Sequence, residues 1–269
     1  MTEGPEASFL AEYIWKHFRG KRLRSIRILK GRYKTHGPGA GFTAFQKLLP
    51  MRLTQVYKKG KVIFLFFEDN WCLIAKMGMT GWFYSGKDRP LFDSEPHVVF
   101  EFDGDTLLFD DFRNFGTLTF TNNIMQIIEE MDRLAPDVLD PSTTDSIVLQ
   151  RVPSIRPHLR IEEVLMNQTM VLSGIGNILK SEILYNARIS PKRTIATLGP
   201  KDWHRILASS KAISKRTLSV LQKRRENEKE EYVQIRKIYD KQRDPEGNKV
   251  ISYRSGDGRT TFYVPALQK

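Results

Sequence analysis

Hydrophobic side chains near the N-terminus recur with the period of an α-helix. Leu10, Ile14 and Phe18 are spaced four residues apart, which places them on one face of a helix. Pro5 is favourable in a first helical turn, where its missing N–H would have no intrahelical partner. The pattern therefore predicts an amphipathic helix over residues 5–18.

Residues 21–121 follow a different pattern, in which short runs of β-branched and aromatic residues are separated by turn residues. Seven runs have this character: Leu23–Leu29, Val62–Phe67, Trp71–Lys76, Trp82–Tyr84, Val98–Phe102, Thr106–Phe109 and Thr117–Phe120. Many short strands at this spacing predict a β-sandwich or a barrel. Residues 31–41, which are rich in glycine, are expected to form an exposed loop.

From about residue 122 the chain becomes polar and helical, and near its end it returns to β composition. Helices are expected over residues 155–168, 177–187 and 201–225, followed by a hairpin whose turn is Gly256–Gly258. The predicted fold class is therefore α+β. Its expected parts are an N-terminal β-sandwich domain with an N-terminal helix (1–121), a linker (122–150), a helical domain (151–231) and a C-terminal β-hairpin (232–269).

Composition excludes several classes of protein. The 269 residues are 40% hydrophobic and 28% charged, which is enough apolar material for a core, and the length favours two domains. No apolar run approaches the roughly 18 residues of a membrane helix, and no signal peptide is recognised, so we expect an intracellular protein. The single cysteine, Cys72, lies in an apolar run and is expected to be buried; intrachain disulfides and cysteine-built zinc sites are excluded.

The net charge of +12 is concentrated in the C-terminal part. Residues 1–150 hold 19 Lys and Arg against 19 Asp and Glu, whereas residues 151–269 hold 24 against 12. Such a basic segment favours a polyanionic partner, because each neutralised phosphate releases counterions. Charge alone leaves DNA, RNA and a merely soluble basic surface open.

The first residues combine groups that could perform covalent chemistry. Removal of Met1 would expose the α-amino group of Thr2, whose ordinary pKa of roughly 7.7–8.0 leaves part of it neutral and nucleophilic near pH 7. Glu3 and Glu6 follow directly, and a carboxyl group can transfer a proton to a reacting oxygen. The alternative is that both carboxylates only stabilise the start of a helix.

Six stretches of the chain, in order from end to end, resemble the formamidopyrimidine-DNA glycosylase/endonuclease VIII family. They are the opening MTEGPEAS, the basic turn at 59–63, KMGMTG at 76–81 (similar to His-Leu-Gly-Met-Ser-Gly), DFRNFG at 111–116 (similar to Asp-Pro-Arg-Arg-Phe-Gly), LSGIGNILKSEILY at 172–185 and DGRTTFY at 257–263. The resemblance implies a β-sandwich, a helix–two-turn–helix domain and a C-terminal finger. It also implies a DNA glycosylase/AP lyase of base excision repair that works as a monomer on damaged or abasic double-stranded DNA, away from membranes.

The same resemblance assigns roles to the catalytic candidates. The amine of Thr2 would attack the sugar, Glu3 would donate a proton, and Lys61 and Glu6 would assist by charge and hydrogen bonding.

Other residues are assigned to DNA. Glycosylases extrude the damaged nucleotide, and Met79, Arg113 and Phe115 would fill the space that it leaves. Asn177 and Arg259 would bind phosphates, with the N–H groups at the helix start after Gly174–Gly176 helping to hold the anion.

Two departures from the family pattern matter. The family's finger usually holds zinc through four cysteines, but residues 232–269 contain none, which predicts a zincless finger with neither metal nor cofactor. Its expected packing residues are Ile238, Tyr239, Val250, Phe262 and Val264. Most relatives carry Pro where this chain has Thr2, so base excision should persist while strand cleavage slows, because a primary amine gives an imine that must first be protonated.

The expected substrate is DNA containing oxidised pyrimidines, as in the endonuclease VIII branch. The missing cysteines and the amino-acid sequence of 172–189 favour that branch. In addition, the charged segment 221–237 lacks the Gly-rich lesion-capping loop of enzymes that excise 8-oxoguanine. An 8-oxoguanine or formamidopyrimidine glycosylase, a catalytically weak damaged-DNA-binding protein and an RNA-binding protein remain as alternatives.

Overall fold

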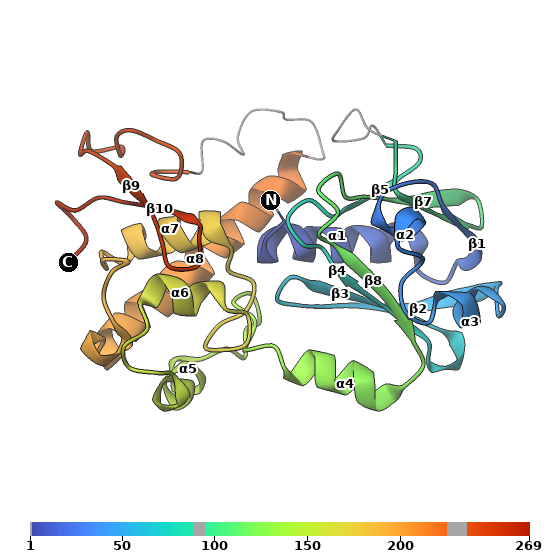
Figure 1. Cartoon of the computed structure of the whole chain (residues 1–269), viewed down its shortest axis with the longest axis horizontal. Helices are drawn as coiled ribbons and strands as arrows, with labels where there is room; N and C mark the ends of the chain where they lie inside the picture. The colour runs from blue at the N-terminus through green and yellow to red at the C-terminus, as the bar shows by residue number, and fades with distance from the viewer. Residues whose placement is uncertain (1, 89–94, 225–235) are drawn as a thin grey trace. The chain divides into compact units, whose positions relative to one another are not determined.

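The computed structural model describes residues 2–88, 95–224 and 236–269. Contacts divide the chain into two compact units. Unit 1 comprises Met1–Thr2 and Glu6–Arg133, and unit 2 comprises Glu3–Pro5 and Leu134–Lys269. In Figure 1 the colour runs by residue number, so residues 6–133 of unit 1 are blue to green and residues 134–269 of unit 2 are green to red.

Unit 1 is a β-sandwich preceded by a helix. Its helical elements are α1 (Gly4–Phe18, whose first two residues belong to unit 2), α2 (Arg32–Thr35), α3 (Phe42–Gln46), η1 (Glu68–Asn70) and α4 (Ile124–Asp132). Its strands are β1 (Arg22–Ile28), β2 (Met51–Lys59), β3 (Val62–Phe67), β4 (Cys72–Lys76), β5 (Trp82–Ser85), β6 (Val98–Phe102), β7 (Asp105–Asp110) and β8 (Thr117–Thr121). The strand order is β5-β7-β6-β1-β2-β3-β4-β8, and neighbours are antiparallel. Only two residue pairs join β1 to β2, so four strands lie on each side of that junction.

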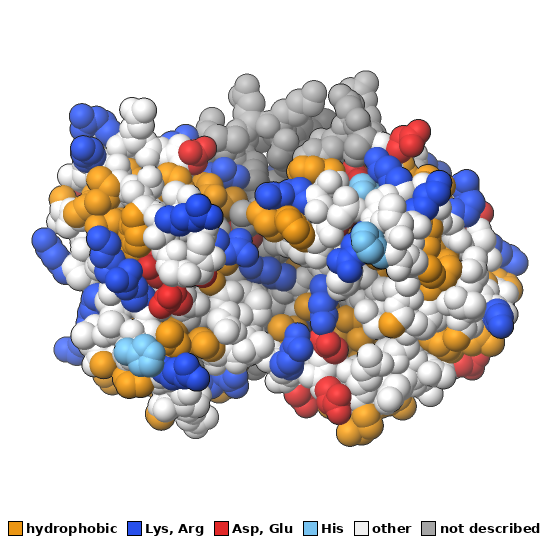
Figure 2. Space-filling view, viewed as in Figure 1, with side chains coloured by type: hydrophobic (Ala, Val, Ile, Leu, Met, Phe, Trp, Pro, Cys, Tyr) orange, Lys and Arg blue, Asp and Glu red, His pale blue; other side chains and the backbone are white. Residues whose placement is uncertain are grey.

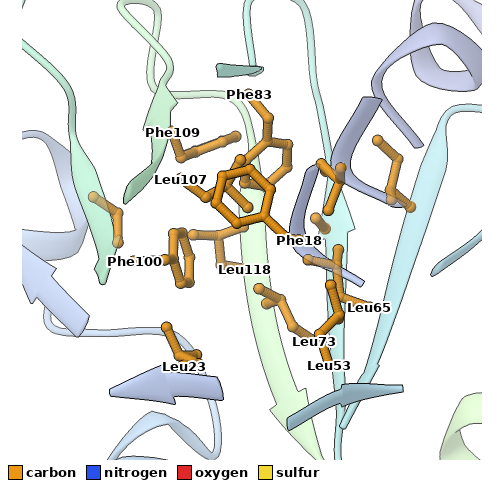
Figure 3. Close-up of a cluster of buried hydrophobic side chains, with 14 of the residues drawn as sticks. Phe18, Leu23, Leu53, Leu65, Leu73, Phe83, Phe100, Leu107, Phe109 and Leu118 are labelled. Atoms are coloured by element: carbon orange, nitrogen blue, oxygen red, sulfur yellow. The ribbon is translucent and has the colours of Figure 1, made fainter. Parts of the chain in front are cut away.

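The core of unit 1 is formed by apolar side chains from both halves of the sheet and from α1. Figure 3 shows ten of them by name, among them Phe18 from α1, Leu65 from β3 and Phe100 from β6. All three side chains are almost completely buried. The helical spacing and the strand runs of the sequence therefore converge on one cluster, as expected for a sandwich covered by a helix.

Most predicted elements of unit 1 are confirmed, with two exceptions. All seven predicted strands form, and the predicted N-terminal helix is α1. Strand β2 was not predicted, because its sequence MRLTQVYKK carries polar side chains at exposed positions and no continuous apolar run. The expectation of an exposed loop at 31–41 is wrong in part: α2 forms there and the Tyr33 ring is buried.

Unit 2 is helical with a small antiparallel hairpin. Its elements are α5 (Asp145–Arg151), η2 (Val152–Ser154), α6 (Ile161–Met166), α7 (Asn177–Asn186), η3 (Ile195–Thr197), α8 (Pro200–Arg224), β9 (Ile251–Arg254) and β10 (Thr260–Tyr263). The predicted helix 155–168 is shorter than expected, because Pro157 disfavours helical backbone in the preceding residue and α6 begins only at Ile161. The segment predicted as a linker, 122–150, contains α4 and most of α5.

Two apolar clusters and one buried carboxylate organise unit 2. Residues of α5, α6, α7 and α8 share one core. Beside it, Ile238, Val250 and Val264 are buried together with Tyr185, as predicted, and Phe262 packs against them; the fifth predicted residue, Tyr239, contacts the ring of Phe262 instead of joining the buried cluster. The buried carboxylate of Glu182 accepts hydrogen bonds from three consecutive backbone N–H groups, those of residues 237, 238 and 239, at 2.8–3.0 Å. The segment that leads to the hairpin is therefore anchored to α7 by one side chain.

Within the described ranges, every helix is too short or too polar to span a membrane.

Candidate functional site

Thr2 is held in unit 1 by two hydrogen bonds to the loop that follows β4. Its backbone nitrogen donates to the carbonyl of Met79 at 3.0 Å, and its Oγ1 donates to the carbonyl of Gly81 at 2.8 Å. The residue is 3% exposed. Both atoms of Thr2 that could take part in chemistry are thus fixed against one short loop, residues 77–81.

The loops that carry Met79, Arg113 and Phe115 are packed against each other. The buried carboxylate of Asp111 accepts hydrogen bonds from the Thr80 hydroxyl and from the backbone N–H of Gly116. Gly78 has a φ of 59°, and a Cβ there would lie 2.6 Å from the carbonyl carbon of Phe115. Glycine is required at that position because the loops touch through their backbones.

The structure therefore brings the three predicted void-filling side chains together in unit 1. The Arg113 guanidinium lies 5.4 Å from the centre of the Phe115 ring, within the range of a cation–π contact. Arg113 and Phe115 are exposed, and Met79 is half-buried. An exposed cation, an exposed ring and a flexible thioether thus project from two adjoining loops.

Lys61 and Glu6, the two assisting candidates, belong to other elements of unit 1. Lys61 is half-buried in the turn between β2 and β3, and Glu6 is buried in the first turn of α1. Their assisting roles stay predictions that rest on the resemblance.

In unit 2 the Glu3 carboxylate occupies the N-terminus of α7. Its oxygens accept hydrogen bonds from the backbone N–H groups of Ile178 and Leu179 at 2.9 and 3.0 Å. A Cβ on Gly176 would lie 2.2 Å from a Glu3 oxygen, so the glycine is needed for this approach. The chain's own carboxylate thus takes up two of the N–H groups at this helix start, and the expected phosphate contact of the helix start stays a prediction.

Asn177 and Arg259 are also brought together in unit 2. The side-chain amide of Asn177 donates to the carbonyl of Thr260 at 3.0 Å, and Thr260 follows Arg259 directly. Asn177 is buried, and in the described part of the chain its Oδ1 makes no hydrogen bond. The Arg259 side chain is half-buried, with its Nε 3.8 Å from a carboxylate oxygen of Asp257.

Sequence reasoning missed the buried polar groups that hold the hairpin to the helices. Lys180 on α7 is fully buried, and its Nζ donates to Thr261 Oγ1 at 2.7 Å. Burial lowers the pKa of Lys180, and the nearby carboxylates of Asp257 and Glu162 oppose that shift. Glu162, also fully buried, accepts from the Tyr253 hydroxyl at 2.8 Å, and burial raises the pKa of Tyr253. The one sequence feature that could have indicated this buried group is the position of Lys180 inside the 172–185 motif, which is otherwise mostly apolar.

The zincless finger stays a prediction, and the described part of the hairpin segment, residues 236–269, shows no arranged set of metal ligands. Among residues 2–88, 95–224 and 236–269, no group of three His, Cys, Asp or Glu side chains is arranged to hold a metal, and the one cysteine lies buried in β4. Carboxylates organise the two turns of the finger instead. Asp244 accepts from the backbone N–H groups of Glu246 and Asn248, and Asp257 accepts from the Ser255 hydroxyl and the Arg259 N–H.

Figure 2 shows Lys and Arg side chains distributed over much of the visible face of both units. In unit 2, Lys241, Arg243 and Lys249 line a hollow of about 610 Å³ on the hairpin segment. This distribution agrees with a polyanionic partner.

Comparison with known families gives matches over most of the chain. Residues 1–118 match the formamidopyrimidine-DNA glycosylase N-terminal domain, and residues 134–227 match the formamidopyrimidine-DNA glycosylase H2TH domain. The formamidopyrimidine-DNA glycosylase of Mycolicibacterium smegmatis is 31% identical over 204 residues, which are 74% of this chain and 70% of that protein. That of Acidothermus cellulolyticus is 28% identical over 222 residues, 81% of this chain and 76% of that protein.

Solved structures share the fold. The structure of Lactococcus lactis formamidopyrimidine-DNA glycosylase bound non-covalently to DNA containing an AP site superposes with a TM-score of 0.83 at 20% identity, covering 99% of each chain. A structure of MutM with DNA containing carbocyclic 8-oxo-G gives the same TM-score at 21% identity and the same coverage. At identities this low, the superpositions show that the fold is shared, and they show nothing about substrate.

Proposed function

Because this chain belongs to the formamidopyrimidine-DNA glycosylase family, we propose that it excises oxidised pyrimidines from double-stranded DNA through a Schiff base on the amine of Thr2. It is a DNA glycosylase of base excision repair with AP lyase activity. The proposal includes a strand-cleavage step slower than that of relatives that begin with Pro.

The placement of Thr2 carries the proposal. A nucleophilic amine must be held in one orientation, and the two hydrogen bonds of Thr2 to the carbonyls of Met79 and Gly81 do this. The loop that holds Thr2 also carries Met79, so nucleophile and void-filling side chain are positioned by the same five residues. A protein that only binds DNA would not need the nitrogen of Thr2 to be held in one orientation, so this arrangement favours catalysis over binding alone.

The reaction proceeds in balanced steps. The neutral amine of Thr2 attacks C1′ of the extruded nucleotide, the bond from C1′ to the base breaks, and the base leaves as an anion that takes a proton from water. The Glu3 carboxylate takes up the proton that the attacking amine gives up and delivers it to the ring oxygen; the sugar opens, and a protonated imine joins the enzyme to C1′. Loss of a C2′ proton breaks the bond to the 3′ phosphate, and a second elimination releases the 5′ phosphate. Water then hydrolyses the imine and restores the amine.

Thr2 explains why elimination is expected to be slow. A Pro amine is secondary and gives an iminium ion that is always cationic, so it withdraws electrons at any pH. The primary amine of Thr2 gives an imine that withdraws electrons only when protonated. Lys61 and Glu6 are proposed to assist proton movement, and the fraction of protonated imine then limits strand cleavage.

The DNA contacts follow from the same assignments. Met79, Arg113 and Phe115 fill the space left in the duplex, which offsets the few kcal/mol that base extrusion costs. Arg259, on the hairpin turn, and Asn177 beside it bind backbone phosphates close to the lesion. These roles are proposed from the resemblance together with the exposure of Arg113 and Phe115.

The choice of oxidised pyrimidines rests on the finger and on the 172–189 segment. Residues 232–269 contain no cysteine, as in the zincless finger of some endonuclease VIII-like proteins. The lesion-capping loop would fall at 221–237, most of which lies outside the described residues. The names of the relatives favour formamidopyrimidine or 8-oxoguanine as the second candidate substrate.

One experiment tests the nucleophile and the substrate together. The purified protein, with its N-terminal mass measured to establish removal of Met1, is mixed with duplexes that contain 5-hydroxyuracil, thymine glycol or 8-oxoguanine and then treated with borohydride. We expect a trapped adduct with both pyrimidine lesions at a rate well above that with 8-oxoguanine. A chain extended by residues before Thr2 serves as the matched control and should form none.

The outcomes separate the candidates. Faster trapping with 8-oxoguanine would replace the substrate assignment and leave the nucleophile in place. Lesion-specific binding without any adduct, from a protein that begins at Thr2, would identify a damaged-DNA-binding protein. An equally fast adduct from the extended chain would remove Thr2 as the nucleophile.

A further inference from the structure

Phe112 is an exposed aromatic side chain that none of the assigned roles uses. It lies in the loop between β7 and β8, next to Arg113, and it is 52% exposed. Phe115, on the other side of Arg113, is 55% exposed. Every other phenylalanine in the described ranges is buried or half-buried, so the two exposed rings flank the same cation.

The exposure of Phe112 does not result from a loosely held loop. In the residue before Phe112, the backbone N–H of Asp111 donates to His97 Nδ1, and the Asp111 carboxylate accepts from the Thr80 hydroxyl and the Gly116 N–H. In the residue after Phe112, the N–H of Arg113 donates to Thr80 Oγ1 at 3.2 Å.

The next residue is fixed as well. Asn114 has a φ of 57°, its N–H donates to the Asp111 carbonyl, and its side-chain oxygen accepts from the N–H of Arg32 at 2.9 Å. Asn tolerates this left-handed backbone better than most residues. The loop therefore presents Phe112 outward from a backbone that is hydrogen-bonded at each neighbouring residue.

The sequence around the ring distinguishes this chain from the family pattern. The stretch that DFRNFG resembles has Pro before the arginine, and Pro has no aromatic face. Exposed aromatic rings together with cationic side chains are typical of surfaces that stack on bases, and Phe112 and Phe115 are exposed rings on either side of Arg113 in the sequence.

We propose that Phe112 is a second stacking ring, which packs against an unstacked nucleobase next to the space filled by Met79, Arg113 and Phe115. The inference rests on the proposed function, because it takes damaged DNA as the ligand. Its contact is with a base face and not with phosphate, so it strengthens binding to interrupted duplexes without regard to sequence and adds no salt dependence. Phe112 thereby increases the preference of the protein for damaged over intact DNA.

The test uses a duplex whose lesion site is a tetrahydrofuran abasic analogue, which has no base to excise. Binding is measured by fluorescence anisotropy for wild type, Phe112→Leu and Phe112→Tyr, each against the analogue duplex and the intact duplex. Phe112→Leu keeps an apolar side chain and removes the ring, whereas Phe112→Tyr keeps the ring. Trp15→Leu, which removes an exposed ring from α1, is the matched control.

We expect Phe112→Leu to raise the Kd for the analogue duplex about tenfold and the Kd for the intact duplex less than about twofold. Phe112→Tyr and Trp15→Leu should stay within about threefold of wild type on both duplexes. The slope of log Kd against log salt should not change in any variant. Thermal unfolding of each variant checks that the fold is retained, because Phe112 contributes little to the core.

An unchanged Kd for Phe112→Leu on the analogue duplex would overturn the inference. Equal weakening on both duplexes would overturn it too, since stacking needs an unstacked base. These results do not depend on catalysis. If wild-type protein fails to form a borohydride adduct, the proposed function fails, while selective loss of analogue binding in Phe112→Leu would still identify the stacking ring.

Discussion

The hydroxyl group of Thr2 gives the sharpest prediction about this protein. Its Oγ1 donates to the Gly81 carbonyl at 2.8 Å in a site that is almost fully buried. Thr2→Val replaces the hydroxyl by a methyl group of nearly the same size, so it removes the hydrogen bond and leaves the packing. Valine is also small enough for Met1 to be removed, so the α-amino group should be present in both proteins.

The magnitude follows from the geometry of that bond. A buried neutral hydrogen bond contributes about 0.5–1.5 kcal/mol, and the carbonyl left without a partner adds to the loss, so we take about 1.5 kcal/mol. If the bond orients the amine at the transition state, that loss corresponds to roughly a tenfold slower reaction. The hydroxyl is directed at a protein carbonyl, so the Kd for DNA should change little.

The assay is the single-turnover rate of borohydride trapping at saturating protein, on one 5-hydroxyuracil duplex. Thr2→Ser keeps the hydroxyl and should react within about threefold of wild type, since the hydrogen bond is retained. Thr54→Val is the matched control: it removes a hydroxyl that donates to the Phe66 carbonyl at 3.1 Å on the exposed side of β2. Its trapping rate should equal that of wild type.

Two results would refute the reasoning. The first is a Thr2→Val protein, shown by mass to lack Met1, that forms the adduct at the wild-type rate. The second is a Thr2→Ser protein as slow as Thr2→Val, which would mean that the methyl group and not the hydroxyl positions the amine.

Three further predictions concern unit 2. Arg259→Ala should weaken binding to lesion duplexes and reduce the salt slope of log Kd by about one phosphate, measured by anisotropy between low and high salt; an unchanged slope would exclude a phosphate contact. Glu182→Gln should lower the free energy of unfolding by about 2–4 kcal/mol in urea, because three backbone N–H groups lose their buried carboxylate acceptor, whereas exposed Glu246→Gln should cost less than about 0.5 kcal/mol. Burial, together with the hydrogen bond from its hydroxyl to Asp244, raises the pKa of Tyr185 to about 12. The raised pKa means that the fold favours the neutral phenol of Tyr185. The stability that this phenol contributes is full below about pH 10 and is lost as the pH rises towards 12. Tyr185→Phe should therefore flatten the fall of Tm measured between about pH 9 and 11.5.

The local elements could be predicted because they depend on short-range patterns. The spacing of Leu10, Ile14 and Phe18 was sufficient for α1, and seven apolar runs were sufficient for seven strands. Strand β2 escaped prediction because one face is exposed and its alternation is broken by Lys58 and Lys59. Tyr33 was misjudged because its neighbours are glycine and charged residues, and only the strands packed over it bury it.

For the candidate site, the resemblance of six stretches to the glycosylase family was enough to nominate Thr2, Glu3, Met79, Arg113 and Phe115. The same motifs could not reveal their partners. At the helix start where a phosphate is expected, Glu3 accepts hydrogen bonds from two N–H groups, those of Ile178 and Leu179, which are 175 and 176 residues away in sequence.

The sequence by itself determined the periodicity of each element, the charge that attracts a polyanion, and the absence of cysteine ligands in the finger. Only the tertiary structure decided which polar groups are buried and what satisfies them, as for Lys180 against Thr261 and Glu182 against the backbone at 237–239. The physical reason is the range of the interactions. A helix or strand is specified by neighbours a few residues apart, whereas a buried lysine or carboxylate is stable only where distant segments supply its hydrogen bonds.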